Sequence, residues 1–314
     1  MVLGIDNNSE AIACFAASVP GARKLCETMP SQRVDWPSGE DVHAHFSPPC
    51  TALSRARAGS ATEEQVEGGI EHLRWSVQTG LSRFASFSVE TVSVPRTRAL
   101  IEGEVRANPK RLACAVVECA DYGVPQTRRR LIAGPPHLIA RLKEAPVARR
   151  VSVADAFGGR PPAPYLKNTT SRRSEEGGTH CVRSCEEAAF TVCGARSLSW
   201  CNAEGKTVRC MPAVDLAVLQ TLPRDWVLPK RTRAATLAVG NAVPSRLASS
   251  IMRAAAGERP MPAFPVVKRT RDEGEVDVRR LQRRVEALEA LVSTLVQPCD
   301  GSNLPIVVTS AEAA

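Results

Sequence analysis

The sequence lacks any run of 18 consecutive apolar residues, and this excludes a membrane-spanning helix of ordinary length. Its first residues, Met1 to Ser9, contain neither a basic segment nor a long apolar one, so they do not form a secretory signal. The 11 cysteines are odd in number and widely spread, a pattern that favours reduced thiols over a disulfide framework. We therefore expect an intracellular protein, cytoplasmic in a bacterium and nuclear in a eukaryote or for a virus of a eukaryotic host.

The composition is that of a globular protein and excludes disorder as the overall state. Of 314 residues, 43% are hydrophobic and 24% are charged, and a chain of this length forms one large α/β domain or two smaller ones. The 41 Lys and Arg residues outnumber the 33 Asp and Glu residues, giving a net charge of +8. A positive balance of this size is compatible with a polyanionic partner such as nucleic acid but does not establish one.

The first 145 residues alternate short apolar runs with amphipathic stretches. Residues 62–80 predict a helix, because Thr62 and Gln65 form a capping box ahead of apolar residues that share one face. Residues 85–90 alternate apolar and polar residues, as a half-buried strand does. Further strands are expected at 113–117 and 131–133, and further helices near 97–106, 137–144, 213–221 and 243–256. Strands separated by helices predict a doubly wound, Rossmann-like α/β fold.

Changes in composition divide the chain into four predicted parts. Residues 1–150 form the α/β catalytic domain, 151–209 form a small insert rich in Pro, Gly, Ser and Arg, and 210–256 return to the catalytic domain. Residues 257–314 begin as a linker and continue as a coiled-coil helix at about 276–297. Its seam of apolar residues, spaced by three and four, either forms a homodimer or packs on its own domain.

Two side chains stand out as candidates for acid–base and nucleophilic chemistry. Cys50 follows Ser47-Pro-Pro in a rigid loop before a capped helix, where a helix N-terminus and nearby Arg residues would lower the pKa of its thiol. Glu90 is expected at the end of a strand, where ligands of such sheets bind and where partial burial lets a carboxyl group donate a proton. A structural loop cysteine and a solvated strand end are the alternative interpretations.

Basic and Gly-containing segments supply two more candidates. In the run Arg128-Arg-Arg130, alternation places Arg128 and Arg130 on one side of the entering strand and Arg129 on the other. Because this run leads directly into an apolar strand, we expect inward-facing guanidinium groups that need an anionic partner. Gly240-Asn-Ala-Val-Pro244 is expected to open a helix, whose free amides can meet a carboxylate.

Five segments occur in one order along the chain. They are Ser47-Pro-Pro-Cys50, Glu90-Thr-Val92, Tyr122-Gly-Val-Pro-Gln126 with Arg128 and Arg130, Leu219-Gln-Thr-Leu-Pro223 with Trp226, and Gly240-Asn-Ala-Val-Pro244. Together they resemble the DNA cytosine-5 methyltransferase family over about residues 1–256. The resemblance implies a Rossmann-like fold that binds S-adenosyl-L-methionine, a small target-recognition region and DNA as the partner.

The resemblance also implies roles for individual residues. Cys50 would add to C6 of a flipped cytosine, Glu90 would protonate N3, and Arg128 and Arg130 would hold the base and orient the glutamate. Methyl transfer from S-adenosyl-L-methionine to C5 and loss of the C5 proton would then release Cys50. The implied cofactor contacts are Asp6 at the end of a strand, Asp35, Asn241 and Val243.

Three departures from the family pattern shape the expectations. No Gly-containing loop that would cradle the cofactor precedes Asp6, Thr91 stands where the family has Asn, and the recognition region is short. Either the chain begins after that loop, or it is an inactive relative that binds DNA or forms assemblies. A zinc site built on His180, Cys181 and the cysteines that follow is not favoured, because paired Cys-x-x-Cys spacing is missing, and we predict no metal.

Overall fold

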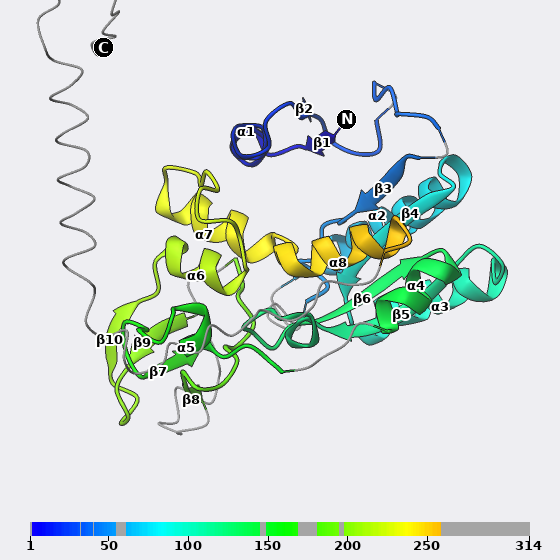
Figure 1. Cartoon of the computed structure of the whole chain (residues 1–314). Coiled ribbons are helices and arrows are strands. Elements are labelled where there is room, and N and C mark those ends of the chain that lie inside the picture. The colour runs from blue at the N-terminus through cyan, green and yellow to red at the C-terminus, as the bar shows by residue number, and fades with distance from the viewer. Residues whose placement is uncertain are drawn as a thin grey trace, which may run out of the picture. The chain divides into compact units, whose positions relative to one another are not determined.

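The computed structural model describes residues 2–31, 33–39, 41–54, 61–144, 149–168, 181–194 and 198–258 (Figure 1). Two compact units are distinguished, Met1–Pro265 and Val266–Ala314, and all described residues belong to the first. The predicted coiled-coil helix at 276–297, with dimerisation through it, therefore lies outside the described residues. No helix in the described ranges is both long and apolar enough to cross a membrane.

Short strands alternate with helices through most of the described chain. The strands are β1 (Leu3–Asp6), β2 (Arg23–Cys26), β3 (His43–Phe46), β4 (Ser86–Val92), β5 (Ala113–Glu118), β6 (Arg129–Gly134), β7 (Tyr165–Asn168), β8 (Val182–Ser184), β9 (Leu198–Cys201) and β10 (Thr207–Cys210). The helices are α1 (Ser9–Ser18), α2 (Glu63–Arg83), α3 (Pro95–Ala107), the 3-10 turn η2 (Cys119–Tyr122), α4 (Pro136–Lys143), α5 (Val153–Ala156), α6 (Ala213–Leu219), α7 (Thr232–Asn241) and α8 (Ser245–Ala255).

The central sheet has the strand order β3-β4-β6-β5. β3 runs parallel to β4, whereas β6 is antiparallel to both of its neighbours. β1 and β2 pair in parallel as a separate two-stranded sheet, and among the described residues no strand pairing joins them to the central sheet. The α/β class predicted from the sequence is confirmed, with the difference that its strands are divided between separate sheets.

The two faces of the central sheet are covered by different helices. On one face, Phe87 and Val89 of β4 pack with Leu73 and Val77 of α2 and with Ile101 of α3. On the other face, the odd-numbered apolar residues of β5 and Ile132 of β6 pack against α4 and α8. Because successive side chains of a strand point to opposite faces, the alternation of Phe87 and Val89 with Ser86, Ser88 and Glu90 separates an apolar face from a polar one.

A second sheet, with the order β10-β9-β7-β8, is antiparallel throughout. Its core centres on Trp200 and Leu166, which are fully buried and pack with residues of α6 and α7. The Trp200 indole donates a hydrogen bond of 2.7 Å to Asp215 Oδ2, and this satisfies its only polar atom. The insert predicted at 151–209 thus contributes the strands of this sheet, and its core is shared with α6 and α7 of the following segment.

Most of the predicted elements are confirmed, and their bounds are corrected. The helix predicted at 62–80 is α2, with the capping box of Thr62 and Gln65 present. The strand predicted at 85–90 is β4, but it continues to Val92, so Glu90 lies within the strand rather than at its end. Gly240 and Asn241 end α7 instead of opening a helix, and α8 begins only after Pro244.

Candidate active site

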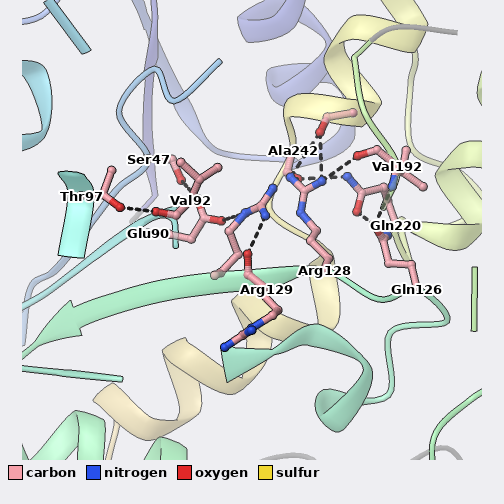
Figure 2. A network of polar contacts seen from close by, with 12 residues as sticks. Ser47, Glu90, Val92, Thr97, Gln126, Arg128, Arg129, Val192, Gln220 and Ala242 are labelled. Carbon is pink, nitrogen blue, oxygen red and sulfur yellow. Dashed lines mark hydrogen bonds and ion pairs between the residues drawn. The ribbon is translucent and has the colours of Figure 1, made fainter. Parts of the chain in front are cut away.

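A buried ion pair joins two of the predicted site residues. Glu90 of β4 and Arg130 of β6 have side chains less than 10% exposed, and Glu90 Oε1 lies 2.7 Å from Arg130 Nε (Figure 2). The contact between Oε1 and Nε is an ion pair whose geometry is not that of a hydrogen bond. Both atoms are therefore buried without a hydrogen-bond partner among the described residues. The other carboxylate oxygen, Oε2, accepts a long 3.5 Å hydrogen bond from Ser47 Oγ. The carboxylate is therefore held mainly by charge, and its Oε1 has no hydrogen-bond donor among the described residues.

Arg128 is buried beside this pair and binds main-chain oxygens instead of an anion. Its guanidinium donates to the carbonyls of Val192 at 2.7 Å, Gly240 at 3.2 Å and Ala242 at 3.2 Å (Figure 2). Burial, together with the charge of Arg130, lowers the pKa of Arg128 to about 10. Arg128 and Arg130 face inward and Arg129 is exposed, as alternation predicts, but the expected anionic partner exists only for Arg130.

Two glutamines continue the network away from Arg128. Gln126 Nε2 donates to Gln220 Oε1 and to the Leu219 carbonyl, both at 2.8 Å, and Gln126 Oε1 accepts from the Val192 amide. Gln220 Nε2 in turn donates to the Val239 carbonyl at 2.6 Å. Both glutamines are fully buried, and they join the segment before β6 to α6 and α7 and support the position of Arg128.

Gly240 is required by a close approach of two backbones. A Cβ atom at this position would lie 2.2 Å from the backbone of Cys193 and of Gly194. The absence of a side chain lets the end of α7 approach the segment that follows Val192, and this brings two of the carbonyls that bind Arg128 together.

Cys50 lies in the loop after β3 and not at a helix N-terminus, since α2 begins only after Thr62, which is its N-cap. It packs beside Leu53, Ile70 and Val92. Burial and the charge of Glu90 raise the pKa of the Cys50 thiol, and Arg130 and Arg128 offset this only in part. The expectation of a lowered pKa is therefore wrong, because it considered neighbouring charges without the burial.

Three residues of the polar network were not singled out from the sequence. His43 and His45 of β3 and Ser47 after it lie on the same side of the strand, and Ser47 contacts Glu90. The pattern His43-Ala-His45-Phe-Ser47 has the period of two that places polar side chains on one face, and this was the signal available.

The four predicted cofactor residues are not brought together. Asp6 is exposed at the end of β1, where it accepts the Asn8 amide at 2.7 Å, and Asp35 is exposed in the loop before β3. Asn241 is exposed at the end of α7, and Val243 packs against the cluster of α4 and α8. No described contact links the two aspartates with Asn241 or Val243, and β1 is not paired with the central sheet. These four residues therefore do not form a single site for S-adenosyl-L-methionine.

Metal ligation finds no support in the part of the chain that the structure describes. In those ranges no group of three His, Cys, Asp or Glu side chains is arranged to hold a metal ion. His180, the first residue of the disfavoured zinc arrangement, lies outside the described residues.

Comparison with known proteins adds a fold-level likeness. No protein-family model matches the sequence, and no curated protein matches it. A DNA modification methyltransferase encoded within an E. coli prophage superposes with a TM-score of 0.52 at 13% identity, covering 82% of this chain and 92% of that one. The chain shares the α/β fold of that protein. A Spodoptera frugiperda DNMT2 variant (TM-score 0.50, 12% identity, 82% and 92% covered) and the Entamoeba histolytica methyltransferase EhMeth (0.50, 10%, 82% and 98%) share it.

Proposed function

We propose that this methyltransferase fold acts on cytosine in DNA, transferring a methyl group from S-adenosyl-L-methionine to C5 through a covalent bond between Cys50 and C6. The proposal rests on the buried Glu90–Arg130 ion pair beside Cys50. The pair lies close enough to Cys50 that Glu90 raises the pKa of its thiol and Arg130 lowers it. The prophage DNA modification methyltransferase with the same fold supports DNA as the substrate, as does the net charge of +8.

The site residues account for activation of the base. The Cys50 thiol gives its proton to solvent water and its sulfur forms a bond to C6, the π electrons of the C5–C6 double bond move to C5 and the ring, and Glu90 passes a proton to N3. C5 thereby becomes nucleophilic and accepts a proton from water. In the reverse direction solvent water takes the original C5 hydrogen as a proton, the C5–C6 double bond re-forms as the sulfur–carbon bond breaks, and N3 returns its proton to Glu90. A base stacked in a duplex does not expose these atoms, so the cytosine must be flipped out.

Arg130 and Arg128 have separate tasks in this scheme. Arg130 fixes the direction of the Glu90 carboxylate by the 2.7 Å ionic contact. Arg128 has its guanidinium nitrogens Nη1 and Nη2 on carbonyls, so it positions the surrounding chain and adds positive charge near Cys50. The methyl donor enters no step of this scheme, because the predicted cofactor residues are not gathered into one site.

Exchange of the C5 hydrogen tests the proposal without any cofactor. The probe is a single-stranded or duplex DNA oligonucleotide with tritium at cytosine C5, and the readout is tritium released to water. We expect release by the wild type and by Cys210→Ser, in which an exposed cysteine of β10 is changed, and none by Cys50→Ser. Release that persists in Cys50→Ser would show that Cys50 is not the nucleophile.

The divided sheets favour a second candidate function. The residues proposed for the cofactor are scattered between β1, the loop before β3 and α7, as expected of a relative that binds DNA without transferring methyl groups. Calorimetric titration of S-adenosyl-L-methionine into the full chain separates the two. Binding in the micromolar range contradicts the inactive relative, whereas DNA binding without cofactor binding contradicts the enzyme.

A further inference from the structure

A ladder of polar side chains leads along β3 and β4 to Glu90. The parallel register sets His43 opposite Ser86 and His45 opposite Ser88, and Ser47 follows at the level of Glu90. Hydrogen bonds connect them in sequence: His43 Nδ1 to Ser86 Oγ at 2.8 Å, His43 Nε2 to Ser88 Oγ at 2.9 Å, His45 Nδ1 to Ser88 Oγ at 2.8 Å, and His45 Nε2 to Ser47 Oγ at 3.3 Å. The series ends where Ser47 approaches Glu90 (Figure 2).

The donors and acceptors of this series allow one consistent direction. An ionised Glu90 only accepts, so Ser47 donates to it and must itself accept from Nε2–H of His45. His45 then accepts at Nδ1 from Ser88, and Ser88 accepts from Nε2–H of His43. Both imidazoles are thus neutral with the proton on Nε2, and every hydroxyl both donates and accepts.

We propose that the ladder of Ser86, His43, Ser88, His45 and Ser47 is a proton relay that supplies Glu90 with the proton it passes to N3 of cytosine. This inference rests on the proposed function. Ser47 gives its proton to Glu90 and takes one from His45 Nε2, while Ser88 protonates His45 Nδ1. His43 and Ser86 repeat the same exchange, and Ser86 takes a proton from solvent water. When N3 returns its proton, each step runs backward and no net charge moves.

The surroundings suit such a relay. Ser88 and Glu90 are buried, His43, His45 and Ser86 are partly exposed, and Ser47 is exposed, so water reaches both ends of the series. Burial lowers the pKa of both imidazoles, of His43 to about 4, so both are neutral near pH 7. The titratable groups that act on them are His45 on His43 and Glu90 on His45, with Arg130 of β6 paired to Glu90. The 3.5 Å contact of Ser47 with Glu90 is the link that a bound base must shorten.

The first test is a measurement on the free protein. Nitrogen-15 NMR of the histidine rings, with His43→Gln and His45→Gln used for assignment, reports which nitrogen carries the proton. We expect Nε2–H in both rings at pH 7. A proton on Nδ1 of His45 would overturn the relay, because the series would then be broken at Ser88.

The second test measures tritium release from C5 in variants of the relay. Ser88→Ala removes the central hydroxyl and His45→Gln keeps a donor but blocks transfer through the ring, so each should slow release about tenfold or more with unchanged DNA affinity. Ser88→Thr restores the hydroxyl and should recover most of the rate. Because the relay acts as a unit, the double variant should be no slower than the slower single variant.

The outcomes separate the relay from the proposed function. If the wild type and both variants release tritium at the same rate, the relay is refuted while the proposed function stands. If the losses of the two single variants multiply, the residues act independently and the relay is likewise refuted. A wild type that releases no tritium refutes the proposed function itself, together with the role of the ladder in it.

Discussion

Acid should destabilise the fold between pH 6.5 and pH 4 through His43. Burial, with a smaller contribution from His45, lowers the pKa of His43 from 6.5 to about 4, so the unfolded chain binds a proton in this range that the folded chain does not. The stabilising contribution is therefore present above pH 6.5 and is lost as the pH falls. Linkage with these values gives a loss of about 2 kcal/mol by pH 5 and about 3 kcal/mol by pH 4.

The assay is urea unfolding followed by tryptophan fluorescence at several pH values, with His43→Gln as the comparison. The glutamine of this variant keeps a donor toward Ser88 and has no charge to gain, so the variant should lose about 3 kcal/mol less between pH 7 and pH 4. His45 stays in both proteins, and Asp155 has its pKa lowered from 3.8, so it titrates below this window. Equal pH dependence in the two proteins would refute the neutral, buried state of His43.

Three further predictions concern the site and its frame. Glu90→Gln removes a charge that raises the pKa of Cys50, so iodoacetamide should label the Cys50 peptide faster at pH 8, and mass spectrometry showing an unchanged rate would contradict this. Gly240→Ala forces a Cβ to 2.2 Å from backbone and should lower unfolding free energy by about 3 kcal/mol or more, whereas Gly68→Ala, which meets nothing within 4 Å, should raise it by up to about 1 kcal/mol. Trp200→Ala should cost about 3–5 kcal/mol in urea unfolding, and a smaller loss would mean that β9 is not central to the second core.

Helix α2 could be predicted because local signals agree over its whole length. Its capping box and its apolar positions, such as Leu73 and Val77, are all visible in the sequence. Helix α7 was missed because its buried side is made of small residues, including Ala235 and Gly240, which give no apolar periodicity. Strands of three or four residues, such as β8 and β9, are too short for alternation to be recognised.

The site was predictable where it depends on alternation and not where it depends on distant contacts. The inward direction of Arg130 in β6 and of Arg128, the residue before β6, follows from the period of two. The carbonyls that bind Arg128 belong to Val192 and Gly240, which are 64 and 112 residues away in sequence. The raised pKa of Cys50 likewise comes from burial by residues of other segments, which no local motif contains.

The central claim is that Cys50 forms a covalent bond to cytosine, and trapping that bond tests it most directly. The protein is incubated with S-adenosyl-L-methionine and DNA containing 5-fluorocytosine, whose C5 fluorine does not leave as a proton does. Intact mass spectrometry should show one DNA adduct that carries the added methyl group, mapped to the Cys50 peptide and absent from Cys50→Ser. An adduct on another cysteine, or one that persists in Cys50→Ser, would contradict the account.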